Sequence, residues 1–134
     1  MISLTPLRRV RLLLALASGL IMAFGFAPYQ APLVGWLAMA ILVFASLDAR
    51  PWIAFLCGFL HGVVYCGISV VWIYGVQRQH GGLLPLEAAA LLALMVAAWG
   101  LFPGTFALCV AWLSRRSIAR ACAAAPFLWV TLEL

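Results

Sequence analysis

Five long apolar runs, separated only by short polar turns, make up almost the whole of this 134-residue chain. They predict helices at residues 10–27, 33–47, 52–76, 85–113 and 120–134. The second run is short, because at ~1.5 Å per residue it reaches about 22 Å against a hydrocarbon core of ~30 Å. Gly100, Pro103 and Gly104 lie inside the fourth run, so we expect a kink or break there.

Runs of this kind need lipid as their solvent. The chain is 68% hydrophobic and 8% charged, whereas a soluble domain is roughly half apolar and about a quarter charged. A small domain has too much surface to hide such an excess in a core. The sequence therefore predicts an all-α fold: a polytopic membrane helix bundle of about five transmembrane helices, a single domain over residues 1–134 with no soluble domain.

The arginines give this bundle an orientation. The chain has no lysine, and five spans put seven of its eight arginines on one side: Arg8, Arg9, Arg11, Arg50, Arg115, Arg116 and Arg120. The opposite loops, residues 28–32 and 77–84, contain only Arg78. Because cytoplasmic loops carry the excess of positive charge, we expect a cytoplasmic N-terminus. The arginines occur in small groups between apolar runs and not as one basic patch, which also argues against nucleic-acid binding.

The stretch from Gly58 to Pro85 organises the bundle. Its small residues share one helical face, on which another backbone can approach closely, and we predict that they pack helices together: Gly58, Gly62, Cys66 and Ser69. The aromatic residues Trp72 and Tyr74 follow, and then the turn residues Gly81, Gly82 and Pro85. This order predicts a helix that leaves the bilayer through an aromatic belt and turns straight back.

Few side chains in the sequence could carry chemistry. Asp48 pairs most simply with Arg50, and Glu87 suits the positive end of a helix dipole. His61 needs a hydrogen-bond partner inside its helix, and we interpret it as a packing residue. Glu133, in an apolar helix, leaves two readings open: it faces a cavity or partner, or it lies at a helix end in water.

The four cysteines form no CxxC pair and no His/Cys cluster with metal-ligand spacing: Cys57, Cys66, Cys109 and Cys122. Each lies in or beside an apolar run, where a cysteine behaves as a small buried hydrophobe. We therefore predict no catalytic residue, no metal site and no cofactor in this chain.

Three pieces of the sequence, in order and with matching gaps, resemble the N-terminal membrane region of bacterial apolipoprotein N-acyltransferases. The pieces are Ala23-Phe24-Gly25-Phe26-Ala27-Pro28-Tyr29, then Gly58-Phe59…Gly62 with Trp72-Ile73-Tyr74 and Gly81-Gly82-Leu83-Leu84-Pro85, then Ala125-Pro126…Trp129…Glu133. The outer turn Gln77-Arg78-Gln79-His80 is more polar than in the family. The resemblance covers the whole chain but only about the first quarter of a family member, so we expect a truncated product, a fragment or half of a split gene.

The resemblance implies a membrane bundle beneath a periplasmic nitrilase-like domain, in the bacterial inner (cytoplasmic) membrane. Such an enzyme takes an acyl chain from phospholipid and passes it to the N-terminal diacylglyceryl-cysteine of a lipoprotein, using a Glu-Lys-Cys triad. This chain has no lysine, so the triad lies elsewhere and the chain is expected to be inactive alone. Its partners would be membrane phospholipid and, with a catalytic domain supplied, a lipoprotein N-terminus.

If the resemblance holds, we expect six residues to face a lipid-accessible cavity: Trp72, Tyr74, Gly81, Gly82, Pro85 and Glu133. For Glu133 the alternative of a helix end in water also stays open. Two alternatives stay open. The chain is a membrane partner of a polyprenol-phosphate glycosyltransferase, or a small multi-pass transporter or assembly protein. A transporter needs polar residues along a midplane path, and here there is little beyond His61, Ser69 and Thr105.

Overall fold

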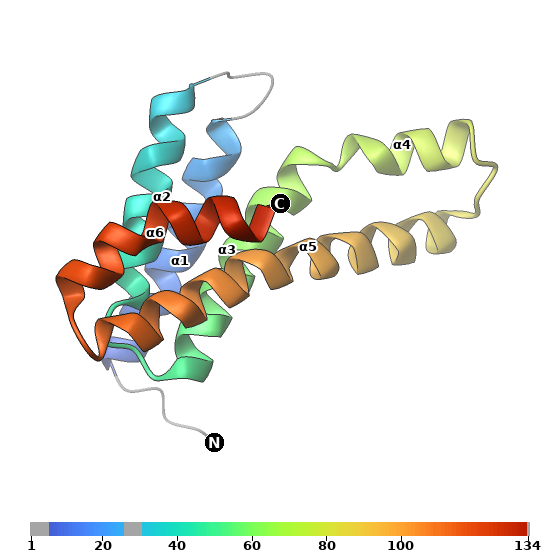
Figure 1. The fold of residues 1–134 in the computed structure, drawn as a ribbon. Helices are drawn as coiled ribbons and strands as arrows, with labels where there is room; N and C mark the ends of the chain where they lie inside the picture. The colour runs from blue at the N-terminus through green and yellow to red at the C-terminus, as the bar shows by residue number, and fades with distance from the viewer. Residues whose placement is uncertain (1–5, 26–30, 134) are drawn as a thin grey trace.

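The computed structural model of this chain describes residues 6–25 and 31–133. These residues form six α-helices and no strand: α1 (Pro6–Phe24), α2 (Pro32–Ser46), α3 (Pro51–Ser69), α4 (Trp72–Gln79), α5 (Pro85–Ser114) and α6 (Ile118–Glu133) (Figure 1). The prediction of an all-α fold is thereby confirmed.

Proline begins four of these helices. Pro6, Pro32, Pro51 and Pro85 are the first residues of α1, α2, α3 and α5. A proline fits there because the first helical N–H has no intrahelical partner and the ring fixes φ near the helical value. At α5 the carboxylate of Glu87 also accepts a hydrogen bond from the Leu84 backbone N–H at 2.9 Å, which anchors the turn to the helix.

The single helix predicted at residues 52–76 is wrong, because the structure divides it. α3 ends at Ser69, a two-residue turn at Val70 and Val71 follows, and α4 continues to Gln79. The break ends a run of five residues of low helix propensity, Gly67-Ile68-Ser69-Val70-Val71, whereas the isolated pair Val63-Val64 stays helical inside α3. Residues 77–79, which were predicted to lie in the outer turn, belong to α4. The outer turn itself is confined to residues 80–84.

The remaining helix boundaries shift by a few residues. α1 begins at Pro6 instead of Val10, and α6 begins at Ile118 instead of Arg120. The predicted end of the first helix at Ala27 and most of the 28–32 loop lie outside the described residues. α5 runs without a break from Pro85 to Ser114 although Pro103 lies inside it, so the expected break is absent.

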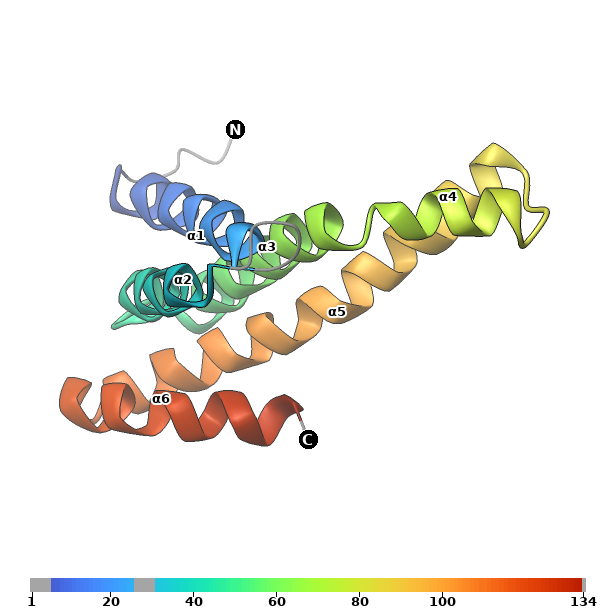
Figure 2. The same cartoon turned by 90° about the horizontal axis from the view of Figure 1, so that it is seen from above.

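α3 lies at the centre of the bundle. It packs against α1 on one side and α5 on the other, while α2 pairs with α1 and α6 pairs with α5 (Figure 2). α4 and the first half of α5 extend away from the other helices as a hairpin (Figures 1 and 2). α4 has no buried residue. The buried residues lie in the other five helices and, at Ala49 and Val70, in the turns beside α3.

A cluster of buried apolar side chains joins α2, α5 and α6. Leu42, Phe106, Val110 and Ala125 are its buried members, and Trp129 packs against them. The Phe106 and Trp129 rings meet edge to face at 86° with centroids 5.2 Å apart, which is a favoured aromatic geometry. This contact holds α6 against the middle of α5.

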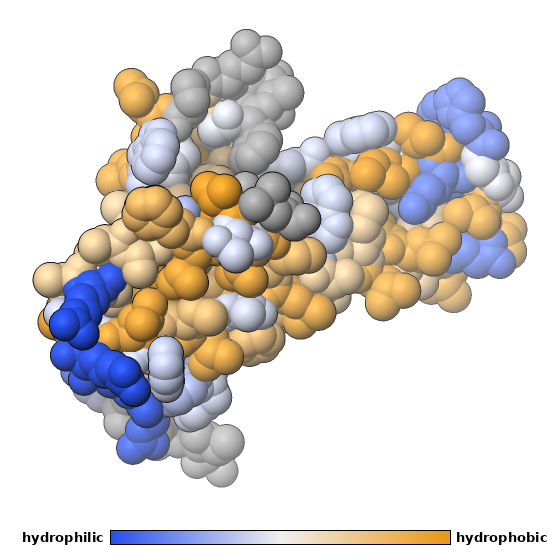
Figure 3. Space-filling view, viewed as in Figure 1, coloured by the Kyte–Doolittle hydropathy of each residue, from blue (hydrophilic) through white to orange (hydrophobic). Residues whose placement is uncertain are grey.

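Two of the described helices, α3 and α5, are long and apolar enough to cross a membrane. Two shorter apolar helices occur at Leu33–Ser46 and Ile118–Leu132. The molecular surface is hydrophobic along the sides of the bundle, and its most hydrophilic patch lies at one end (Figure 3). The length test thus supports fewer crossings than the five expected from the sequence.

Candidate functional site

The crossing of α3 and α5 is close because glycines face each other there. A Cβ atom on Gly58 would collide with the Pro103 carbonyl oxygen, and one on Gly62 would lie 2.8 Å from the Gly100 Cα. A real side chain at either position needs the two backbones to separate. Of the other small residues predicted on this face, Cys66 is buried against Val96, and the buried Ser69 hydroxyl has no hydrogen-bond partner among the described residues.

A buried polar chain links three helices below this crossing. The Ser18 hydroxyl donates to the Ala38 carbonyl oxygen at 2.7 Å, and the Ser18 oxygen lies 2.8 Å from His61 Nδ1. Because the hydroxyl proton is already committed, His61 must donate its Nδ1–H to Ser18. α1, α2 and α3 are thereby joined through two fully buried side chains. The partner expected for His61 is confirmed as Ser18, while its Nε2 has none among the described residues.

An aromatic cavity of about 520 Å³ opens between α3, α5 and α6. Its wall consists of Tyr65, Trp99, Phe102, Pro103, Trp129 and Leu132. Pro103 has no N–H, so the Trp99 carbonyl lacks the usual helical donor four residues later. A cavity of this size and apolarity lies in the range that holds a small molecule or part of a lipid.

The residues predicted to face a cavity lie elsewhere in the fold. Trp72 is exposed and Tyr74 is half-buried on α4, while Gly81 and Gly82 form the exposed turn and Pro85 begins α5. Gly82 has φ +65°, a backbone conformation that glycine adopts without strain. None of them lines the aromatic cavity. Their proposed role in contacting lipid stays a prediction.

Glu133 is the last residue of α6, directly after Leu132 in the cavity wall. The structure describes its backbone only, so the two readings of its carboxylate stay open. The neighbouring Trp129 and Leu132 were found by the structure alone as cavity residues, and Trp129 belonged to the family-like piece of the sequence.

No nucleophilic site is assembled in the described part of the chain. Cys57 and Cys66 are buried, Cys109 is half-buried and Cys122 is exposed. The described residues contain no group of three or more His, Cys, Asp or Glu side chains that could hold a metal ion. Glu87, the carboxylate nearest the outer turn, is engaged at the start of α5.

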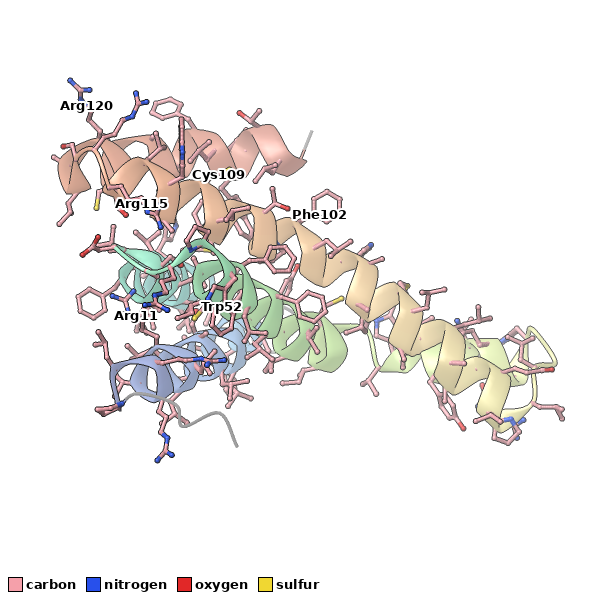
Figure 4. All side chains as sticks on the ribbon, turned by 90° about the horizontal axis from the view of Figure 1, so that it is seen from below. Arg11, Trp52, Phe102, Cys109, Arg115 and Arg120 are labelled. Atoms are coloured by element: carbon pink, nitrogen blue, oxygen red, sulfur yellow. The ribbon has the colours of Figure 1, made fainter. Side chains whose placement is uncertain are left out.

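The end of the bundle away from the α4–α5 hairpin is basic. Figure 4 shows Arg11, Arg115 and Arg120 toward this end of the bundle. Arg11 donates to the Ala45 and Leu47 carbonyl oxygens at 2.8 and 2.7 Å, which satisfies acceptors left free at the end of α2. Arg8 stacks over the Trp52 ring at 4.1 Å. Arg78, at the far hairpin, donates instead to the Leu83 carbonyl at 2.8 Å.

Sequence reasoning missed the contributions of Ser18 and of the aromatic cavity. Ser18 lies 43 residues from His61, and nothing in its local sequence distinguishes it from other small residues on an apolar helix. The cavity residues come from three helices, so only the packing of α6 on α5 brings them together. The Trp129 position was the one signal available, through its place in the third family-like piece.

Comparison with known proteins gives a consistent match. The family model described as "Apolipoprotein N-acyltransferase N-terminal domain" matches residues 18–134. A curated apolipoprotein N-acyltransferase from Methylococcus capsulatus is 35% identical over 127 residues, 91% of this chain and 24% of that protein. One from Shewanella oneidensis is 30% identical over 131 residues, 95% of this chain and 25% of that protein. One from Geobacter metallireducens is 35% identical over 126 residues, 90% of this chain and 23% of that protein.

The chain therefore spans about a quarter of the length of the curated relatives it matches. These names give no support to the glycosyltransferase-partner or transporter alternatives.

Proposed function

This chain belongs to the apolipoprotein N-acyltransferase family, and from that premise we propose that it forms the membrane portion of such an enzyme. The complete enzyme would move an acyl chain from phospholipid to the N-terminal diacylglyceryl-cysteine of a lipoprotein. In this proposal the bundle is a membrane domain in the bacterial inner membrane, and its contribution is to receive lipid. Catalysis belongs to a nitrilase-like region that residues 1–134 do not include.

The observation that carries the proposal is the aromatic cavity between α3, α5 and α6. Its residues are almost all apolar, as a site for hydrocarbon requires. At ~1.5 Å per residue, Tyr65 is about 21 Å along α3 from Pro51, and Trp129 about 17 Å along α6 from Ile118. The cavity thus lies well away from the basic end.

We place the bundle with five spans and a cytoplasmic N-terminus. Seven arginines at one end and Arg78 alone at the other support this orientation. α3 and α5 have the length for full crossings, while α2 at 15 residues needs a locally thinned bilayer or help from its flanking turns. The cavity then lies in the outer half of the membrane, on the side where a periplasmic catalytic domain acts. Trp72, Tyr74 and the Gly81–Gly82 turn would form the upper rim of the lipid path.

The test is a chimera. Residues 18–134 replace the matching segment of the Methylococcus capsulatus relative, in cells whose own acyltransferase is depleted, and triacylation of a lipoprotein is followed by mass spectrometry. The chimera should restore the triacylated product. Leu132→Trp, which fills the cavity, should reduce product, whereas Val130→Trp on the exposed side of α6 should not.

Full activity of the Leu132→Trp chimera would show that lipid does not use this cavity. A chimera that folds in the membrane and yields no product with the native cavity would contradict the proposed function itself.

Alone, the chain should show no N-acyltransferase activity. A thioester route needs a thiolate, a base and donors for the oxyanion, and the chain has no lysine. Purified chain, phospholipid and a diacylglyceryl peptide should give no triacylated peptide above a protein-free control. Turnover that disappears when Cys57, Cys66, Cys109 or Cys122 is changed to alanine would place the chemistry in this domain.

A further inference from the structure

The basic end of the bundle contains two arginine–tryptophan pairs. Two of its arginines lie over tryptophan rings: the Arg8 guanidinium carbon is 4.1 Å from the Trp52 ring centroid, and that of Arg116 is 5.2 Å from the Trp112 centroid. The two pairs come from different helices of the bundle. Arg8 and Trp52 lie in the first turns of α1 and α3, while Trp112 lies in the last turn of α5 and Arg116 in the turn that follows it.

These guanidinium groups lack an anionic partner. Seven arginines share this end with a single carboxylate, Asp48. Arg11 is occupied by two backbone carbonyls, and the side chains of Arg9, Arg50, Arg115 and Arg120 make no hydrogen bond or ion pair with any residue that the structure describes. The Arg8 Nε atom is buried and has no acceptor within residues 6–25 and 31–133. A buried N–H without an acceptor is costly, so the site calls for one.

The two tryptophans indicate at which level of the membrane the missing acceptor lies. Trp52 and Trp112 are 48% and 56% exposed on the sides of the bundle, and tryptophan in such positions prefers the level of the lipid headgroups. A guanidinium stacked on the ring is held flat and directs its N–H fork at the same level. The anions at that level in a bacterial membrane are lipid phosphodiesters, whose oxygens match the fork. Acidic phospholipids are favoured among them because their net charge is negative and this end of the bundle is strongly positive.

We propose that the basic end binds anionic phospholipid headgroups, with one phosphate on the Arg8–Trp52 pair and one on the Arg116–Trp112 pair. The ligand class is a lipid phosphodiester with net negative charge, on the cytoplasmic leaflet. This binding is separate from the cavity in the outer half of the bundle. It rests on the membrane placement proposed above and needs no catalytic activity.

The test compares lipids that stay bound to the full chain. The protein is reconstituted in phosphatidylcholine vesicles with a minor fraction of phosphatidylglycerol, extracted in mild detergent, and its bound lipids are quantified by mass spectrometry. The native chain should retain phosphatidylglycerol above its share in the vesicle. In the double variant Arg8→Gln, Arg116→Gln, the enrichment of phosphatidylglycerol should fall about fivefold for each arginine removed. The matched variant Arg78→Gln, at the other end, should keep the native enrichment.

A charge-conserving pair separates the fork from simple attraction. Arg8→Lys with Arg116→Lys keeps the net charge but cannot stack flat or bind bidentately. Because both lipids carry the phosphodiester, the lysine pair should retain less total phospholipid than the native chain, while its preference for phosphatidylglycerol should exceed that of the glutamine pair. Retention of the full preference by the glutamine pair, or an equal loss in Arg78→Gln, would overturn the proposal. Displacement of phosphatidylglycerol by inorganic phosphate would show that the site prefers the free ion.

Measurements on the native chain also test the proposal without any variant. Inserted protein without any enrichment of phosphatidylglycerol contradicts the lipid site only. A chain that does not enter the bilayer contradicts the membrane placement and this proposal together.

Discussion

At Gly62 two helix backbones approach so closely that no side chain fits between them. A Cβ atom there would lie 2.8 Å from the Gly100 Cα and 3.0 Å from the Pro103 ring. Neither neighbour is a flexible side-chain end that could move aside. The contact replaces side-chain packing with direct contact between backbones, which is how helices associate tightly where lipid supplies no hydrophobic drive.

Gly62→Leu should therefore separate α3 from α5 and destabilise the bundle by about 1–3 kcal/mol, the usual cost of overpacking. Thermal unfolding in detergent measures the loss. Gly75→Leu is the matched control, because nothing lies within 4 Å of a Cβ at Gly75. Equal midpoints for the native chain and Gly62→Leu would mean that this face of α3 is not packed.

The Ser18 hydroxyl is the second residue with a measurable role. Ser18→Ala removes both the acceptor of His61 and the donor to Ala38, and should cost about 1 kcal/mol, as hydrogen bonds between membrane helices do. Thr105→Ala should cost less, because the Thr105 hydroxyl bonds only to Leu101 in its own helix. Unfolding midpoints of the two variants give the comparison. A larger loss in Thr105→Ala would refute the linking role of Ser18.

The sequence predicted residue roles where spacing alone carries them. Gly58 and Gly62 fall on one face of any helix, so their closeness to another backbone was foreseeable. The partner of His61 was not, because helix pairing selects Ser18 from several small residues along α1. The cavity residues depend on the same pairing, which no local pattern encodes.

Among the elements, the hairpin of α4 and the first half of α5 stands apart. α5 has 30 residues, which at ~1.5 Å each exceeds the ~30 Å hydrocarbon core by about half. α4 contributes no buried residue. The outer end of the hairpin should then project past the hydrocarbon, where its backbone meets water.

Hydrogen exchange tests this element directly. Amides of α4 should exchange at least about tenfold faster than those of α3 in a reconstituted bilayer, since local opening costs little where nothing is buried. α3 serves as the internal control, because seven of its residues are buried. Equal protection of the two helices would mean that α4 is covered by lipid or by protein.

Element existence was easier to predict than element limits. Each apolar run became a helix, and the prolines fixed the starts of α2, α3 and α5. The division between α3 and α4 escaped prediction because Val70 and Val71 keep the apolar pattern intact while weakening the helix. The short α2 and α6 show the reverse case, in which composition predicts a span and length falls short of one.

The whole molecule has a single axis of polarity. One end holds seven arginines, and the face drawn in Figure 3 is largely hydrophobic beyond that end. The aromatic cavity lies about midway along α5, at Trp99, Phe102 and Pro103. This distribution underlies each proposal made above, since the cavity serves a periplasmic catalytic domain only if the basic end is cytoplasmic. The orientation of the bundle in the membrane therefore decides which side the cavity can serve.

Reporter fusions measure that orientation most directly. Alkaline phosphatase, which is active only in the periplasm, is fused after residue 30, after Gln79 and after Ser117, with a cytoplasmic reporter at the same sites as control. The account predicts periplasmic signals after residue 30 and Gln79, and a cytoplasmic signal after Ser117, because the arginines of the α5–α6 turn stay inside. A cytoplasmic signal after Gln79, with the protein still in the membrane fraction, would contradict it.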